Sequence, residues 1–248
     1  MSNNQALISI QNLSKQYAKA SDYSLRDFSL NISPGEKFGI FGPNGAGKTT
    51  LISILCGGLQ PTEGDFNFHL NNTKSVSESI GLVPQELALY LELTALQNLE
   101  YFGALCKMTA LEIQSRSTEL LSLLGLEKVA DKKVNTYSGG MKRRLNLAIG
   151  IIHNPAILFL DEPTVGVDIQ SKNAILTFLN KLNNAGTTII YTSHHLAEAE
   201  ELCDRIAILD HGKLIASNAL DKLLLEHQAN NLTEVVLKLT GEEYRDNV

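Results

Sequence analysis

One eight-residue run constrains the fold of this chain more than any other feature of its sequence. It joins three glycines to a lysine and a threonine at fixed spacing, in the order Gly42, Pro43, Asn44, Gly45, Ala46, Gly47, Lys48 and Thr49. This spacing fits the pattern G-x-x-x-x-G-K-[ST], a loop that turns its backbone N–H groups toward the phosphates of a nucleotide. Because such a loop connects a strand to a helix, the run predicts an α/β chain with a nucleotide-phosphate site.

The sequence on either side of the loop has the required character. Residues 37–41 read as a short apolar strand, and residues 50–55 read as a helix that a pair of glycines would end. We expect Lys48 to reach the β- and γ-phosphates as a point charge, Thr49 to ligate Mg²⁺, and Thr50 to line the site beside them. The alternative is a chance match in a glycine-rich turn, which a chain of this length would show on the order of 1% of the time.

The composition limits which partners and which cellular compartment are compatible with this chain. The 248 residues are 44% hydrophobic and 19% charged, which is typical of a soluble globular protein. A net charge of −6 without a basic block argues against a nucleic-acid partner. The three cysteines, Cys56, Cys106 and Cys203, are too far apart in sequence to suggest a metal site or a disulfide framework, and they favour a reducing compartment. Without a recognisable signal peptide or an apolar stretch near the ~18 residues of a membrane span, we expect a cytoplasmic chain that reaches a membrane only through another subunit.

Apolar patterns outline the remaining elements. Strands are predicted at residues 7–10, 28–32, 66–68, 157–160 and 188–192, turns at 33–36 and 61–65, a helix at 171–182 and a hairpin at 206–216. Capping boxes beginning at Thr94 and Thr109 precede apolar residues at helical spacing, Leu96 among them, so residues 86–135 are expected to form a helical insertion. Strands that alternate with helices imply a mainly parallel sheet with its ligand at the carboxyl ends of the strands.

Two carboxylates follow the apolar run 157–160. Asp161 is placed to hold Mg²⁺ through Thr49 or water, and Glu162 is placed to accept a proton from an attacking water. An acidic turn before Pro163 would be the simpler interpretation if the phosphate loop were absent.

Four further segments occur in a fixed order along the chain. They are V-P-Q-E at 83–86, Y-S-G-G-M at 137–141, V-G-V-D at 165–168 and T-S-H at 192–194. Together with the phosphate loop they resemble the Q-loop, signature, D-loop and switch-histidine segments of ATP-binding cassette (ABC) ATPases. The resemblance covers almost the whole chain. It implies a P-loop NTPase core with a mainly parallel sheet, formed by residues 1–85 and 136–216, and this core includes an N-terminal antiparallel β subdomain. It also implies an inserted α-helical subdomain at residues 86–135 and a C-terminal helical extension at residues 217–248.

The resemblance also assigns roles to individual residues. Gln85 would contact Mg²⁺ and the attacking water, and Asp168 would cross a dimer interface. The residue that contacts the γ-phosphate and the water would be His194 rather than His195, because of the Glu198-Ala199-Glu200 segment that follows it. The turn that opens the helix 141–152 would bind the γ-phosphate of ATP held by a second subunit, and it is formed by Ser138, Gly139 and Gly140.

An aromatic side chain is expected to stack on the adenine. Tyr17 is the first candidate and Tyr23 the alternative, while an ordinary surface tyrosine is the competing interpretation at roughly 30% for either one. Tyr137 and Met141 depart from the leucine and glutamine usual in the signature, which affects the subfamily more than the phosphate contacts.

The subfamily is indicated by two segments. Residues 138–148 resemble ATPase subunits of ABC-2-type exporters, and residues 231–241 resemble the C-terminal segment of that group, with Leu232, Val235, Val236 and Leu239 on one helical face and Gly241 as a stop. The basic run 142–144 is expected to be a solvated helix face. We therefore predict an ATPase that works as a dimer, expected to be a homodimer, with an integral membrane permease and on the inner face of the cell membrane. The alternatives are an importer or other membrane complex, a non-transport ABC protein, and a cassette that binds ATP without turnover.

Overall fold

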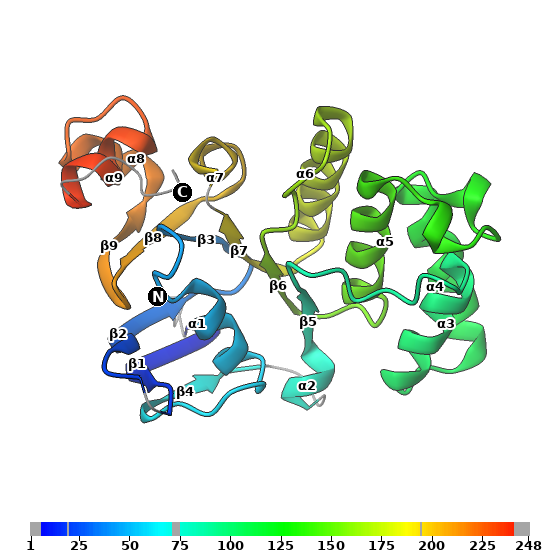
Figure 1. Cartoon of the computed structure of the whole chain (residues 1–248), viewed down its shortest axis with the longest axis horizontal. Helices are drawn as coiled ribbons and strands as arrows, with labels where there is room; N and C mark the ends of the chain where they lie inside the picture. Colours follow the sequence, from blue (N-terminus) through cyan, green and yellow to red (C-terminus); the bar gives the residue numbers. More distant parts are fainter. Residues whose placement is uncertain (1–5, 19, 71–74, 194, 241–248) are drawn as a thin grey trace, which may run out of the picture. The chain divides into compact units, whose positions relative to one another are not determined.

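The computed structural model describes residues 6–18, 20–70, 75–193 and 195–240 (Figure 1). The chain separates into two compact units, which are Met1–Thr73 with Thr188–Val248, and Lys74–Thr187. The phosphate loop belongs to the first unit, whereas the Q-loop, signature, carboxylate pair and D-loop segments all belong to the second. Each unit is therefore described by itself.

The first unit contains a three-stranded antiparallel sheet in the order β2-β1-β4. Its strands are β1 (Ile8–Gln16), β2 (Tyr23–Ile32) and β4 (Glu63–Phe68). The strands predicted at 7–10, 28–32 and 66–68 lie in the right places, but each is shorter than the strand that forms. The turn predicted at 61–65 is wrong in its second half, because β4 begins at Glu63. Asp65 pairs with Gln11 and Glu63 with Ser14, and an irregularity in β1 between those two positions lets the Glu-Gly-Asp run continue the ladder.

The first unit also contains four strands in the order β7-β3-β8-β9. They are β3 (Lys37–Phe41), β7 (Thr188–Ser193), β8 (Arg205–Asp210) and β9 (Lys213–Ala219). β3 runs parallel to both β7 and β8, and each of these three strands is almost entirely buried, as continuous apolar strands of a parallel sheet are. The predicted hairpin is confirmed, because β9 pairs antiparallel with β8 through a turn in which His211 and Gly212 both have positive φ.

Helices complete the first unit. They are α1 (Lys48–Leu55), α7 (Leu196–Leu202), α8 (Leu220–Glu226) and α9 (Leu232–Thr240), and α8 packs against α9 (Figure 1). In α9, Leu232, Val235 and Val236 are buried and Leu239 is half-buried, which confirms the predicted helical face. Gly241, the predicted stop, lies outside the described residues.

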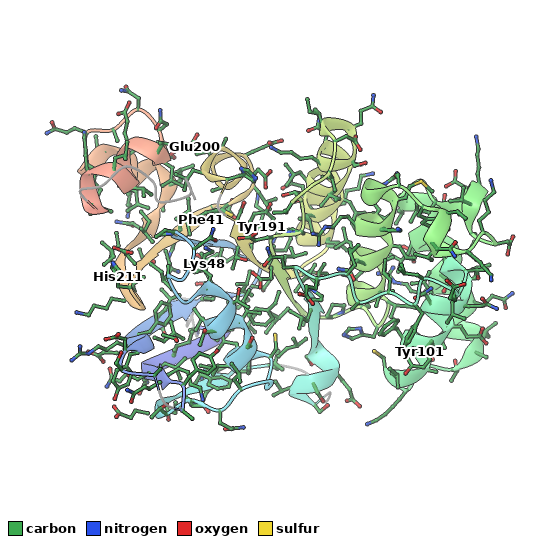
Figure 2. All side chains as sticks on the ribbon, in the orientation of Figure 1. Phe41, Lys48, Tyr101, Tyr191, Glu200 and His211 are labelled. Atoms are coloured by element: carbon green, nitrogen blue, oxygen red, sulfur yellow. The ribbon has the colours of Figure 1, made fainter. Side chains whose placement is uncertain are left out.

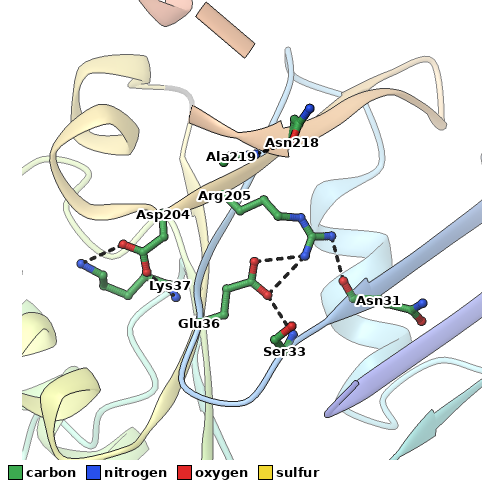
Figure 3. A network of polar contacts seen from close by, with 8 residues as sticks. All are labelled: Asn31, Ser33, Glu36, Lys37, Asp204, Arg205, Asn218 and Ala219. Atoms are coloured by element: carbon green, nitrogen blue, oxygen red, sulfur yellow. Dashed lines mark hydrogen bonds and ion pairs between the residues drawn. The ribbon is translucent and has the colours of Figure 1, made fainter. Parts of the chain in front are cut away.

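A polar network holds the strand that leads into the phosphate loop. The Arg205 guanidinium donates to both carboxylate oxygens of Glu36, at 3.0 and 3.3 Å, and to the carbonyl oxygen of Asn31 at 2.8 Å (Figure 3). Next to it, Lys37 donates its backbone N–H to Asp204 and pairs with the same carboxylate through its ammonium at 3.4 Å. Both sets of contacts connect the start of β3 to the start of β8, so they anchor the strand on which the loop depends.

The second unit combines two parallel strands with helices. Its elements are α2 (Val76–Ser79), β5 (Ile80–Val83), α3 (Ala95–Leu105), α4 (Ala110–Leu123), the 3₁₀ turns Glu127–Val129 and Val134–Thr136, α5 (Gly139–Ile151), β6 (Ile157–Asp161) and α6 (Ile169–Asn184). β5 pairs in parallel with β6 from Ile80 opposite Ile157 to Val83 opposite Leu160. The described residues contain no helix that has both the length and the apolar character required to cross a membrane.

Local signals set the ends of the helices in residues 86–135. Both predicted capping boxes form, with Thr94 accepting from Gln97 N–H and Thr109 accepting from Glu112 N–H. α4 ends as expected at Gly125, where φ is +65° and the N–H of Leu126 bonds back to Leu121. Of the apolar residues at helical spacing in α3, Leu96 is exposed, while Leu99 three residues later is fully buried.

Candidate nucleotide-binding site

The phosphate loop joins β3 to α1 in the first unit, as the pattern requires. Gly47, immediately before α1, has φ +105°, and a Cβ there would lie 2.9 Å from Leu25 Cδ2 and collide with the Ser24 carbonyl oxygen. Gly45 has φ +80° with open space around it. The last glycine is therefore required by packing as well as by backbone conformation, and the middle one by backbone conformation alone.

Lys48 lies over the loop (labelled in Figure 2). Its ammonium donates to the carbonyl oxygens of Gly42 at 2.7 Å and Pro43 at 3.2 Å, and only 6% of the residue is exposed. The ammonium is thus already desolvated and bonded to oxygen at the mouth of the loop, which matches the binding of phosphate oxygens. Thr49 is exposed in the first turn of α1 and Ala46 is buried beneath the loop.

The two candidate tyrosines differ in their surroundings. The Tyr17 hydroxyl lies 3.3 Å from Thr50 Oγ1, which places its exposed ring next to the residue that follows the loop. Tyr23 instead donates to Glu63 at 3.4 Å and lies under the Arg26 guanidinium. Of the two, Tyr17 is therefore the one that contacts the loop region.

The predicted histidine, His194, lies outside the described residues. The residues on either side of it are well defined by hydrogen bonds. Ser193 Oγ accepts from the N–H of His195 at 2.9 Å, and the buried Tyr191 hydroxyl donates to Glu198 at 2.6 Å. These contacts connect the end of β7 to the start of α7.

The carboxylate pair and Gln85 come together in the second unit. Asp161 is the last residue of β6, and Asp161 and Glu162 are each only 5% exposed. Gln85 Nε2 donates to Glu162 Oε2 at 3.1 Å across 77 positions of sequence. Glu162 has φ +49°, an unfavourable backbone conformation for a non-glycine residue that is often found at functional sites.

The signature segment forms the start of α5. Ser138 caps the helix by accepting from the N–H of Met141 at 3.2 Å, and Ser138 and Gly139 are exposed. The buried Gly140 packs against α6, where a Cβ would collide with Ser171 Oγ and lie 2.8 Å from its Cβ. The start of α5 thus combines two exposed residues with a close helix contact at the third.

Asp168 is engaged within its own chain. Its carboxylate accepts from the Ser171 N–H and from the Ser171 hydroxyl, both at 2.9 Å, and so caps α6. These hydrogen bonds lower the pKa of the Asp168 carboxyl. A contact from this residue to a second subunit remains a prediction.

The expectation that residues 142–144 form a solvated face is wrong for both arginines. Arg143 donates to the carbonyl oxygens of Gln85 and Val165, the latter at 3.3 Å. Arg144 donates to Leu124 O at 2.6 Å and to Gly140 O at 3.4 Å. Sequence reasoning missed these roles because three adjacent cations are usually solvated. The available signal was Asn146, three residues after Arg143 in an otherwise apolar stretch of the helix.

Comparison with known proteins identifies the chain. Residues 25–165 match the family model described as ABC transporter. The linearmycin resistance ATP-binding protein LnrL of Bacillus subtilis is 42% identical over 85% of this chain and 68% of its own length. The daunorubicin resistance ATP-binding protein DrrA3 of Streptomyces coeruleorubidus is 38% identical over 95% of this chain and 75% of its own. The chain belongs to the ABC transporter family.

Solved structures agree with this assignment. An ATP-binding subunit of an ABC transporter superposes with a TM-score of 0.84 at 27% identity, covering 94% of this chain and 99% of that one. The dimeric cassette MJ0796, in a post-hydrolysis state bound to ADP and Pi, superposes with a TM-score of 0.76 at 30% identity, covering 86% of this chain and 98% of that one. The predicted fold class, an α/β ABC cassette with an antiparallel N-terminal sheet and a mainly parallel one, is confirmed. As an ABC ATPase the chain binds and hydrolyses ATP.

The predicted magnesium ligands have the donor chemistry that this ion prefers. The candidate ligands, Thr49, Asp161 and Gln85, offer only oxygen donors if Gln85 uses its amide oxygen, and oxygen is what Mg²⁺ prefers. Among the described residues no group of three His, Cys, Asp or Glu side chains could hold a metal by itself.

Proposed function

We propose that this ABC ATPase powers an ABC-2-type exporter, with a separate integral membrane permease as its partner. The support comes from relatives that serve resistance or export, which include linearmycin and daunorubicin resistance proteins and a Nod factor export protein of Bradyrhizobium diazoefficiens that is 39% identical over 85% of this chain. ATP would close a dimer of two such chains, expected to be a homodimer, on the inner face of the membrane. A nucleotide that contacts both chains only in the closed state must favour closure.

The catalytic proposal is carried by the hydrogen bond between Gln85 and Glu162. Gln85 Nε2 donates to Glu162 Oε2 at 3.1 Å, so the Q-loop glutamine orients a buried carboxylate, and a carboxylate in this position would accept a proton from the attacking water. Thr49, Asp161 and Gln85 would hold Mg²⁺, which neutralises charge on the phosphates when it is bound. Lys48 would exchange its loop carbonyls for phosphate oxygens, and His194 would contact the γ-phosphate.

The second phosphate contact is proposed for the start of α5. This 13-residue helix begins at the exposed Gly139, directly after its exposed cap Ser138, and the helix dipole favours an anion there. A γ-phosphate held by the loop of the second chain would supply that anion. Asp168 would lie at the same interface, and Tyr17 would stack on the adenine.

The replacement Glu162→Gln tests the catalytic proposal. It keeps the hydrogen-bonding shape but removes the base, so we expect ATP affinity within about twofold of the parent and turnover reduced roughly 100-fold or more. Phosphate release measures turnover, and light scattering measures the ATP-bound dimer that should accumulate. An unchanged hydrolysis rate would exclude Glu162 as the base.

We further propose that the permease docks in a groove of the second unit. The groove has a volume of about 750 Å³, and its lining combines the apolar side chains of Leu105, Met108, Leu111 and Ile152 with polar and charged ones, which include Glu78, Lys107, Glu112, Arg116 and Glu119. Leu105 and Leu111 are 63% and 76% exposed, which is unusual for leucines beside a cavity and typical of a surface that another protein covers. A segment of the membrane subunit that presents both apolar and charged side chains would complement this lining.

A matched pair of variants tests the docking proposal. Leu111→Glu places a charge in the groove, whereas Leu123→Glu places one on the same helix at a position that is 48% exposed and does not line it. We expect only Leu111→Glu to abolish co-purification with the permease and export in cells, and the ATPase rate of the isolated chain to be unchanged in both. Equal losses in the two variants would overturn this docking site. If the genetically linked permease instead mediates uptake, the importer alternative holds.

A further inference from the structure

One face of α5 packs along the segment that contains Gln85. Arg143, Asn146 and Gly150 recur at spacings of three and four, so they lie along one side of the helix. A Cβ on Gly150 would lie 2.6 Å from Val83 Cγ2, which shows how closely α5 approaches the end of β5. The small residue at this position lets the helix backbone pack against the strand from which Gln85 follows.

Asn146 and Arg143 hold the backbone on both sides of Gln85. Asn146 is buried, accepts from the N–H of Ala88 at 3.1 Å and donates to the carbonyl oxygen of Pro84 at 3.3 Å. Arg143 donates through Nη1 to the carbonyl oxygen of Gln85 itself. The position of Gln85 is therefore set by side chains of the signature helix.

The same guanidinium reaches the loop after Glu162. Its Nε donates to the carbonyl oxygen of Val165 at 3.3 Å, three residues beyond the carboxylate that Gln85 contacts. Burial lowers the pKa of Arg143 and the charge of Glu162 acts in the opposite direction, so the cation and the carboxylate lie within electrostatic reach. One side chain thus connects the signature helix, Gln85 and the Glu162 loop.

We propose that Arg143 is a positioning residue that holds Gln85 and Glu162 in register with the start of α5. This inference rests on the catalytic roles proposed for those two residues. An arginine suits the task because its planar fork presents separate N–H groups to two acceptors, which a lysine ammonium on a flexible stem cannot reproduce with the same geometry. Any displacement of α5 by a phosphate at its first turn would be transmitted to Gln85 and the Glu162 loop.

Three variants of the full-length chain test the proposal. Arg143→Gln should lower kcat roughly 10- to 100-fold, the range for loss of hydrogen bonds from a charged group, while the Kd for ATP stays within about twofold. Arg143→Lys should recover only part of this loss because it keeps the charge but not the fork. Lys142→Gln removes a neighbouring charge that makes no side-chain hydrogen bond or ion pair in the part of the chain described, and it should behave like the parent.

A double-mutant cycle separates positioning from general destabilisation. If Arg143 acts through Gln85, Arg143→Gln should reduce kcat at least threefold less in a Gln85→Ala background than in the parent. Equal reductions in both backgrounds, or a kcat of Arg143→Gln within twofold of the parent, would overturn the proposal. If Arg143→Gln does not fold, Arg143→Lys decides, since parental turnover in that variant also overturns it. If Glu162→Gln loses turnover while the Arg143 variants keep the kcat of the parent, the proposed function stands and only this inference is rejected.

Discussion

The phosphate loop and the cluster around Gln85 carry out related tasks by different structural means. The loop is eight consecutive residues that form their own site, with Lys48 bonded to carbonyl oxygens five and six positions earlier. The cluster joins Gln85 to Arg143 and Glu162, which come 58 and 77 positions later in the sequence. The first depends on local backbone conformation, and the second depends on how a helix packs against a strand.

This difference predicts how each region fails. A change in the loop should affect nucleotide binding directly, because the altered group itself contacts phosphate. A change in α5 should affect turnover or stability while the loop keeps its nucleotide. The following variants test this distinction, beginning with the largest expected effect.

Lys48→Ala should produce the largest change. It removes an ammonium that can make two charge-assisted hydrogen bonds, so ATP affinity should fall by about 3 kcal/mol, roughly 100-fold. Isothermal titration of ATP gives the affinity, with Lys213→Ala, an exposed lysine of β9, as the control. Undiminished ATP affinity in Lys48→Ala would refute the role of the loop.

Gly140→Ala tests whether the signature glycines are needed for packing. The new Cβ would overlap Ser171, so the free energy of unfolding should fall by about 2 kcal/mol, as in overpacked cores. At Gly139 the nearest atom to a new Cβ is 3.7 Å away, so Gly139→Ala should cost clearly less. Adding Ser171→Gly to Gly140→Ala should recover stability in urea unfolding. Equal costs at the two glycines would mean that packing does not distinguish them.

Tyr17→Ala tests the aromatic contact beside the loop. Loss of a stacked base costs about 1–3 kcal/mol in nucleic-acid complexes, and we expect the low end, a roughly fivefold to tenfold weaker ATP affinity, at this exposed site. Tyr23→Ala is the control, because its hydroxyl contacts Glu63 instead. Fluorescence titration with ATP measures both. If Tyr23→Ala has the larger effect, the assignment of the two tyrosines is reversed.

Thr109→Ala should produce the smallest change, and it should be confined to stability. It removes the capping box of α4, which costs about 1 kcal/mol. Chemical unfolding measures the loss, and the ATPase rate at 25 °C should equal that of the parent. A marked loss of turnover would show that α4 affects catalysis, contrary to the distinction drawn above.

The elements predicted correctly are those with a signal in neighbouring residues. The capping boxes at Thr94 and Thr109 and the stop at Gly125 formed as expected, because each is a contact between residues three to five positions apart. The errors arose where a distant partner decided the outcome. Glu63 and Asp65 have turn composition but pair with β1.

The candidate site divides in the same way. The loop residues and the Asp161–Glu162 pair follow from motifs with adjacent flanking strands, and their roles remain predictions. The contacts of Arg143 and Arg144 could not be predicted, because a basic run on a helix gives no information about which carbonyl groups lie beside it. Three of their four acceptors belong to segments 20 to 58 positions away, and the fourth, the carbonyl oxygen of Gly140, is four positions away.

The sequence by itself determined the phosphate loop, the helix ends at Thr94, Thr109 and Gly125, and the family, because these depend on backbone conformation and on residue order over short spans. The tertiary structure alone decided that Gly140 has no room for a side chain, that Glu162 has a left-handed backbone conformation, and that Arg143 bonds to Gln85 and Val165. The physical reason is that close packing and the satisfaction of buried polar groups depend on neighbours in space, which the order of residues does not specify.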